Sequence, residues 1–456
     1  MDKLKGYMKS VTQKKYLPFW VFAVVMGIYH VIMREPEGSD AMWFFRNQLD
    51  TYTLTDYLNM RYDTWSSRLL IEAVLVYISR NILAWKLLDF VFWMFLAWAL
   101  VWIFPEEKRE TASCFIVGVL LLYPMWDLRT AGWIATSVNY SWPLALGVFS
   151  LHGTARTFRR QKTPVYMWIL YSLAALYAAN MEQMAAVLFG INFCAAVCFV
   201  LEKRPWKQYA GTLGVTAIAV AELIFIFTCP GNGARKEQEI INWMPNFGSY
   251  HLLDKVSMGF VDTMHHLIAS GNLIYLCYTG CLAWIVCLKT KDVKIRFAAA
   301  VPVGINLWFV AGSDMMERFF PGFFKLMEKN AFICGSNYHL AANYIPTVLY
   351  LLLAGCMLVS FVTVCESYFE LFGQGILLAL GLASRIVMGF TPTIYVSQER
   401  TFFYLYIIFG ISGAFFLQQN FSLLKKHPRL YEALKLSAVF LVFIGVAANL
   451  AEIGSV

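Results

Sequence analysis

The stretch ANYIPTVLYLLLAGCMLVSFVTV (residues 342–364) contains no charged side chain and is long enough to cross a hydrocarbon core about 30 Å thick. Comparable apolar runs recur along the 456 residues of the chain, for example at 17–33 and 84–104. Of all residues, 59% are hydrophobic and 14% are charged, against about 25% charged in an average soluble domain. We therefore predict an all-α, polytopic transmembrane helical bundle that forms one membrane domain over residues 1–456, without a soluble C-terminal domain.

The apolar runs predict about eleven to fourteen membrane spans. Thirteen can be placed at 17–33, 84–104, 112–123, 140–157, 165–179, 184–200, 210–229, 267–288, 297–311, 342–364, 371–390, 401–417 and 434–450. The first run is followed by Arg34 and Glu35 and not by the small residues of a cleavage site. We therefore expect it to be a retained helix.

Lysine and arginine concentrate in alternate short connections between these runs. They are Lys3, Lys5, Lys9, Lys14 and Lys15, and then residues 108–109, 159–162, 203–207, 289–296 and 425–429. Basic loops stay in the cytoplasm, so the N-terminus is predicted to be cytoplasmic. The loops expected on the outer side are 34–83, 124–139, 180–183, 230–266, 312–341 and 391–400. The connection 365–370 is an exception, because it carries acids and no base.

Charged residues at or near the outer ends of the spans point to an external functional site. An ionisable group near membrane depth is energetically costly and often marks function. Structural charges would scatter over both sides, whereas these gather on one. They are Asp40, Arg68, Asp127, Arg129, Glu182, Arg235, Arg385 and Arg400.

The first outer loop, residues 34–83, carries the candidate catalytic residue. Asp40 lies in GSDAMWFF directly after the first span, where a carboxylate can act as a general base or bind a metal ion. A solvated loop acid is the alternative. Residues 65–81 have an amphipathic pattern, so we expect helices of this loop to lie along the outer surface.

Several outer residues have side chains suited to a phosphorylated sugar. Arg68 can grip phosphate and Trp65 can stack on a sugar, or the two can anchor the chain at the bilayer edge. Asn139 and Tyr140 lie in an aromatic and amide-rich stretch that suits sugars, or that forms an ordinary aromatic belt. Glu182 is interpreted as a sugar-hydroxyl acceptor, a second carboxylate or an arginine partner.

Three arginines are candidates for binding a phosphate. In PGNGAR (230–235), exposed backbone N–H groups together with Asn232 and Arg235 suit an anion, or the stretch is a helix stop and turn. Arg385 and Arg400 flank the turn at Pro392, where they can neutralise a lipid phosphate or serve as membrane anchors. The adjacent His265 and His266 point apart on a helix, so no metal site is predicted.

These motifs together resemble a known group of proteins. The acid after the first span, WSSR (65–68), NYSWP (139–143), MEQ (181–183), PGNGAR and TPTIY with the later ER (391–400) look like bacterial multi-span proteins similar to the GT-C superfamily of membrane glycosyltransferases. The resemblance implies a polyprenyl-phosphate-linked sugar donor and an extracytoplasmic active site. It makes Asp40 the base and Arg235 or Arg400 the phosphate ligand. Relatives often have paired acids where this chain has Ser39-Asp40, which leaves a need for Mg²⁺ or Mn²⁺ open.

The predicted function is therefore transfer of a sugar from a polyprenyl-phosphate carrier to a cell-envelope glycan, by a multi-pass protein of the bacterial plasma membrane. A polysaccharide polymerase or ligase is one alternative, and a transporter or flippase of lipid-linked sugar is the other. The net charge of +8 does not indicate nucleic-acid binding, because the bases lie in short loops between membrane spans.

Overall fold

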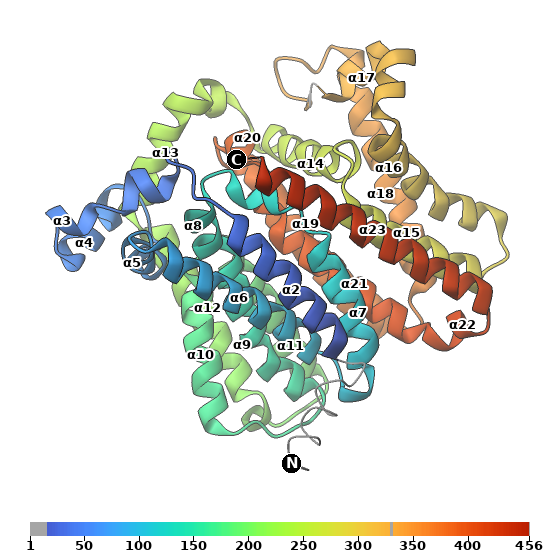
Figure 1. The fold of residues 1–456 in the computed structure, drawn as a ribbon, viewed down its shortest axis with the longest axis horizontal. Helices are drawn as coiled ribbons and strands as arrows, with labels where there is room; N and C mark the ends of the chain where they lie inside the picture. Colours follow the sequence, from blue (N-terminus) through green and yellow to red (C-terminus); the bar gives the residue numbers. More distant parts are fainter. Residues whose placement is uncertain (1–15, 329–331, 456) are drawn as a thin grey trace.

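A computed structural model describes residues 16–328 and 332–455, and over these residues the chain is helical with no strand. The five N-terminal lysines used in the topology prediction lie outside the described residues. The chain forms a bundle of long helices with shorter helices gathered at one end (Figure 1). The all-α prediction is confirmed.

The long helices follow one another with short connections. In the first half they are α2 (Leu17–Ile32), α6 (Ile82–Trp102), α7 (Arg109–Leu121), α9 (Trp142–Phe158), α10 (Val165–Ala179), α11 (Glu182–Leu201) and α12 (Ala210–Thr228). In the second half they are α14 (Leu252–Ile268), α15 (Leu273–Lys289), α16 (Val293–Phe319), α18 (Tyr344–Val364), α19 (Tyr368–Ile386), α21 (Phe403–Gln419) and α23 (Pro428–Gly454).

The shorter elements lie mostly in the connections predicted to be outside. They are η2 (Ala41–Phe45), α3 (Gln48–Thr51), α4 (Leu54–Thr64), α5 (Leu69–Ile78), η4 (Met125–Arg129), α8 (Trp133–Thr136), η5 (Ser137–Ser141), α13 (Pro230–Trp243), η7 (Pro245–Ser249), α17 (Pro321–Glu328), η9 (Val387–Phe390), α20 (Ile394–Ser397) and η10 (Gln398–Phe402). At the other end are η3 (Glu106–Lys108), η6 (Trp206–Gln208) and α22 (Phe421–Lys425), and η8 (Ala341–Asn343) precedes α18.

The helices make this a multi-pass membrane protein. Each of the thirteen predicted runs coincides with a helix. In the part of the chain that the structure describes, 8 helices are long and apolar enough to cross a membrane, or 9 if α14 and α15, bent by 80°, form one span. This is fewer than the eleven to fourteen expected. The difference arises because α2, α7, α9 and α10 have only 16, 13, 17 and 15 residues.

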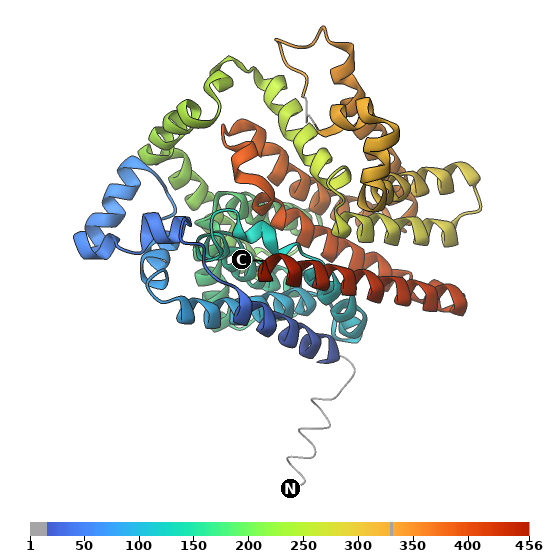
Figure 2. The same cartoon turned by 45° about the horizontal axis from the view of Figure 1, so that its top comes forward.

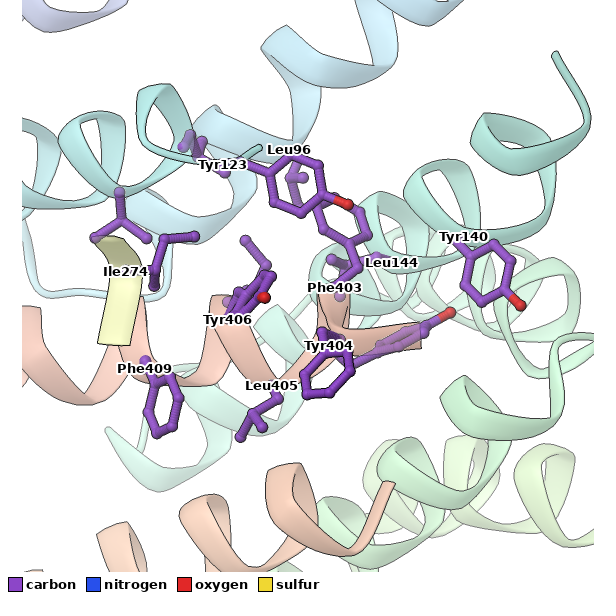
Figure 3. Close-up of a cluster of buried hydrophobic side chains, with 14 of the residues drawn as sticks. Leu96, Tyr123, Tyr140, Leu144, Ile274, Phe403, Tyr404, Leu405, Tyr406 and Phe409 are labelled. Atoms are coloured by element: carbon purple, nitrogen blue, oxygen red, sulfur yellow. The ribbon is translucent and has the colours of Figure 1, made fainter. Parts of the chain in front are cut away.

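Helix α21 forms the centre of the bundle. Of the apolar stretch within Glu399–Gln419, which includes α21, 78% is buried. It packs against α7, α15 and α19. Its aromatic side chains interlock with those of neighbouring segments, and Phe403 meets Tyr123 edge to face with ring centroids 4.8 Å apart. Figure 3 shows this cluster, in which Tyr404 on α21 extends toward Tyr140. Such packing of large rings fixes the position of the polar residues at the end of α21.

The connections separate into two sets at opposite ends of the bundle, as their alternation along the sequence predicts. At one end, which we call the basic end, Arg204 donates to the carbonyl of Thr157 at 2.6 Å and Gln418 donates to that of Lys108 at 3.0 Å. The acidic connection 365–370 lies there too, because Lys289 pairs with Glu366 at 3.1 Å. The exception noted in the sequence thus obtains its base from the neighbouring loop.

The opposite end, which we call the long-loop end, brings together residues 34–83, 124–139, 180–183, 230–266 and 391–400. The 230–266 segment is helical and not an open loop, since α13 and α14 occupy most of it. The PGNGAR motif forms the first turn of α13, because proline at the first helical position is favoured. At Gly231 the backbone of α13 packs closely on residues 61–65 at the end of α4. Figure 2 shows α4 and α13 projecting together from one flank.

Helix α5 fastens the first long loop to the bundle. Its residues Ile71, Leu75 and Val76 are buried in the core, whereas Tyr77 and Leu70 are exposed. One face of this segment therefore packs on the bundle, in keeping with the amphipathic pattern predicted for residues 65–81.

Candidate functional site

Arg68 lies at the centre of a polar network at the long-loop end. Its Nε donates to Glu182 Oε2 at 2.8 Å, and its Nη2 lies 2.6 Å from the same oxygen. Its Nη1 donates to Asn139 Oδ1 at 3.0 Å. Arg68 precedes α5, Asn139 lies in η5 and Glu182 begins α11. Three predicted site residues from distant parts of the sequence therefore meet.

Asn180 holds the chain next to Arg68 in place. Its Oδ1 accepts hydrogen bonds from the backbone N–H groups of Leu70 at 3.0 Å and Ile71 at 3.2 Å. Its Nδ2 donates to the carbonyl of Ser67 at 3.3 Å. The first turn of a helix leaves N–H groups without intrahelical partners, and a buried group without a partner is destabilising. Asn180 therefore ties the start of α5 to the end of α10.

We expect Asn180→Ala to lower the free energy of unfolding by about 1–3 kcal/mol, because it leaves buried N–H groups of α5 unsatisfied. The measurement is thermal or denaturant unfolding of the purified protein in lipid. Asn47→Ala is the control, since Asn47 is exposed and its side chain makes no capping hydrogen bond. Equal stability of the two variants would contradict this role for Asn180.

Two further arginines approach the same place. Arg235 on α13 interacts electrostatically with Glu182, and its Nε lies 3.5 Å from Glu239 Oε1. Burial raises the pKa of Glu239, and the charges of Arg235, Arg68 and Arg400 act against that rise. We call Arg68, Arg235 and Arg400 the arginine cluster. Glu182 and Glu239 only partly offset its charge, because burial favours the neutral form of Glu239.

Arg400 connects the arginine cluster to a second part of the site. Its Nη1 donates to Thr130 Oγ1 at 3.3 Å. Among residues 16–328 and 332–455, no carboxylate lies within ion-pair distance of Arg400. Arg400 nevertheless interacts electrostatically with the carboxylate of Asp40. An arginine whose only partner is a neutral hydroxyl retains donors for an anion.

Asp40 lines a hollow of about 540 Å³, which we call the Asp40 hollow. Its other walls are Pro36, Gly38, Ser39, Trp126, Arg129, Thr130, Ala131 and Gly132. The backbone N–H of Asp40 donates to the carbonyl of Ala131 at 3.0 Å, which fixes the loop against η4. Burial raises the pKa of the Asp40 carboxyl, and Arg400 opposes the rise. A carboxylate of raised pKa is a better proton acceptor than an exposed one.

Glu35 is a second carboxylate beside Asp40 that the sequence interpretation did not include in the site. Its Oε2 accepts from the backbone N–H of Ile134 at 3.1 Å. Burial raises its pKa, and Asp40 adds to the rise. The sequence feature that could have identified Glu35 as a site residue is its position five residues before Asp40. No group of three His, Cys, Asp or Glu side chains suited to a metal ion occurs within the described chain.

Three other predicted residues lie apart from this hollow. Arg385 is 1% exposed, pairs with Asp262 and has its guanidinium 4.4 Å from the ring centroid of Phe402. Trp65 packs under Arg61 at 5.5 Å and beside the first turn of α13. Asn232 donates to Ser67 Oγ at 3.1 Å, which holds α13 to the loop before α5. Their roles in ligand binding stay predictions.

Tyr140 and Tyr404 both interact electrostatically with Arg68 of the arginine cluster. Figure 3 shows these two side chains. Among the described residues, the buried hydroxyl of Tyr404 has no hydrogen-bond partner. Tyr404 also lines a cavity of about 190 Å³ between α9, α11, α19 and α21, whose other walls include Leu144, Met184 and Ile408. Tyr404 therefore links the arginine cluster to the apolar part of the bundle.

Comparisons of the chain with protein-family models, with curated proteins and with solved structures find no match.

Proposed function

We propose that this protein is a membrane glycosyltransferase of the GT-C type. It transfers a sugar from a polyprenyl-phosphate carrier to a cell-envelope glycan on the extracytoplasmic face of the bacterial plasma membrane. The observation that carries the proposal is the apolar cavity lined by Tyr404, a residue that also interacts electrostatically with Arg68 of the arginine cluster. A lipid tail and its phosphate need such adjacent apolar and cationic sites. Arg400 of the same cluster donates to Thr130, which lines the Asp40 hollow.

The separation of the basic end from the long-loop end supports the proposed orientation of the protein in the membrane. The basic connections gather at one end, and basic loops remain in the cytoplasm. The long-loop end, which carries the arginine cluster and the Asp40 hollow, then faces the outside of the cell. Lipid-linked sugars are available there, whereas nucleotide sugars are cytoplasmic.

In the proposed reaction Asp40 accepts the proton of the acceptor hydroxyl as its oxygen bonds to the anomeric carbon of the donor. The bond between that carbon and the phosphate oxygen breaks, and the electron pair stays on the phosphate. Arg400 and Arg235 stabilise the negative charge that develops there, because preorganised donors need no reorientation during the reaction. Glu182 keeps Arg68 in position near Tyr404, which lines the apolar cavity.

The test is transfer of radiolabelled sugar from synthetic polyprenyl-phosphate sugars by the purified protein in liposomes, with envelope glycopolymer as acceptor. Release of polyprenyl phosphate with label in the polymer supports the proposal. Movement of the donor between leaflets without release would identify a flippase instead. Turnover only with oligosaccharide donors would identify a polymerase or ligase.

We expect Arg400→Gln to lower the transfer rate by about 10²–10³-fold, the effect typical of removing one donor to a developing anion. Arg400→Lys keeps the charge and should retain more activity, although it loses the planar donor geometry. Arg46→Gln is the control, because Arg46 is an exposed arginine of the first long loop. A wild-type rate in Arg400→Gln would exclude Arg400 from the reaction.

A further inference from the structure

We propose that the Asp40 hollow binds the acceptor through an acidic group, so that the acceptor is an anionic glycan carrying a carboxylate or a phosphate. This inference rests on the proposed function for the identity of the hollow as the acceptor site. The residue that would recognise the acidic group is Arg129, and the residue that would pack on a sugar ring is Trp126.

The geometry of the hollow holds Arg129 ready for a ligand. The Arg129 guanidinium lies 4.5 Å from the ring centroid of Trp126, which orients its plane. Both side chains and Asp40 line the same hollow of about 540 Å³, within the roughly 300–1,000 Å³ typical of small-molecule sites. Trp126 is 41% exposed, so part of its indole is accessible from solvent. The N–H edge of the guanidinium can then meet an anion while a sugar packs on the indole.

Arg129 has no acidic partner among the residues that the structure describes. It differs in this from Arg61, Arg68 and Arg385 of the same end, which pair with Glu72, Glu182 and Asp262. The acid nearest in the sequence, Asp127, is buried and makes no ion pair with Arg129 within the described chain. Burial and the charge of Glu399 raise the pKa of Asp127, which favours its uncharged form.

The positions of Arg400 and Arg129 divide the site between donor and acceptor. Arg400 donates to Thr130, which lines the hollow, and also interacts electrostatically with Glu239, the partner of Arg235. In the proposed reaction Arg400 therefore serves the donor phosphate together with Arg235. Arg129 lines the hollow itself, beside Asp40. A second anion bound at Arg129 would thus belong to the molecule whose hydroxyl Asp40 deprotonates.

Binding of defined glycan fragments to the full-length protein in lipid nanodiscs tests this inference without any transfer. The probes are a neutral disaccharide, the same disaccharide with a uronic acid, and the same disaccharide with a phosphate. We expect one of the acidic fragments to bind about ten- to a hundredfold more tightly than the neutral one, and the preference to weaken in high salt. The tighter of the two identifies carboxylate or phosphate as the recognised group.

Two arginine variants separate a specific contact from general surface charge. Arg129→Gln should abolish the preference, and Arg46→Gln should leave it intact. Unchanged binding of polyprenyl phosphate by Arg129→Gln shows that the variant is folded. Equal affinities for acidic and neutral fragments in the wild type, no binding of any fragment, or a preference that persists in Arg129→Gln would overturn the inference. A wild-type protein that prefers acidic fragments but transfers no sugar would overturn the proposed function and retain the anionic site.

Discussion

Replacing Asp40 by Asn is expected to lower the rate of sugar transfer by about 10²–10⁴-fold, the contribution typical of a general base. Asn has nearly the shape of Asp but accepts no proton. The carboxylate makes no hydrogen bond or ion pair with any described residue, whereas the loop is held by the backbone N–H of Asp40 and by the carboxylate of Glu35. The variant should therefore fold and bind the donor normally. The measurement is kcat with saturating donor, next to donor binding by the same preparation.

Asp63→Asn is the matched control, because Asp63 is an exposed acid of the same loop that does not line the Asp40 hollow. It should transfer sugar at the wild-type rate. Full activity in Asp40→Asn would remove Asp40 from the mechanism. Equal loss in both variants would instead indicate a general effect of charge in this loop.

The pH dependence of the reaction provides a second readout for Asp40. The base works in its ionised form, so activity is present above its pKa and falls as the pH drops through it. Burial raises that pKa, so the acidic limb of kcat/KM should lie above the ordinary value of about 3.9. The limb should be absent from the residual activity of Asp40→Asn.

The second large effect concerns stability, at the ion pair between Asp262 on α14 and Arg385 on α19. Asp262→Asn should lower the free energy of unfolding by about 3–5 kcal/mol, because it leaves a buried guanidinium without its counter-charge. Arg385 is 1% exposed, and two of its nitrogens already lack hydrogen-bond partners within residues 16–328 and 332–455. Denaturant unfolding in lipid or detergent measures the change.

The double variant Asp262→Leu with Arg385→Met tests the physical reason. Replacing both charges by apolar groups of similar size should recover most of the lost stability, since no unpaired charge remains. Transfer by the recovered protein then decides the predicted role of Arg385 as a phosphate ligand. Retained activity would make the pair purely structural, and lost activity in a stable protein would support the ligand role. A double variant less stable than Asp262→Asn would contradict the electrostatic explanation.

Much of the helical organisation is visible in the sequence, because it depends on local composition. A run of apolar residues such as 342–364 satisfies its own backbone hydrogen bonds as a helix, and α18 forms there. The alternation of basic connections likewise anticipates which loops share an end of the bundle. Eight or nine of the described helices reach spanning length, fewer than the thirteen apolar runs, because α2, α7, α9 and α10 are short. Prolines and polar residues bound two of these short helices. Pro124 follows α7, and Pro164 and Asn180 bound α10.

The same local signals singled out several residues of the candidate site. Ionisable residues in apolar surroundings are conspicuous, and Asp40, Arg68, Glu182 and Arg235 stand out for this reason. Arg129 was noted as an outer charge but given no role. Glu35 was interpreted only as the end of a span, although it lies five residues before Asp40 in the sequence.

By itself, then, the sequence determined that the chain is an all-helical membrane protein whose charged residues gather in one set of loops. The tertiary structure alone decided which of those residues meet. Arg68 and Glu182 are 114 positions apart, and their contact depends on how α5 and α11 pack. The same packing pairs Arg385 with Asp262, leaves Arg400 and Arg129 without an acidic partner among the described residues and forms the cavity lined by Tyr404. Hydropathy is a property of neighbours in the chain, whereas ion pairs and cavities are set by residues that folding brings together.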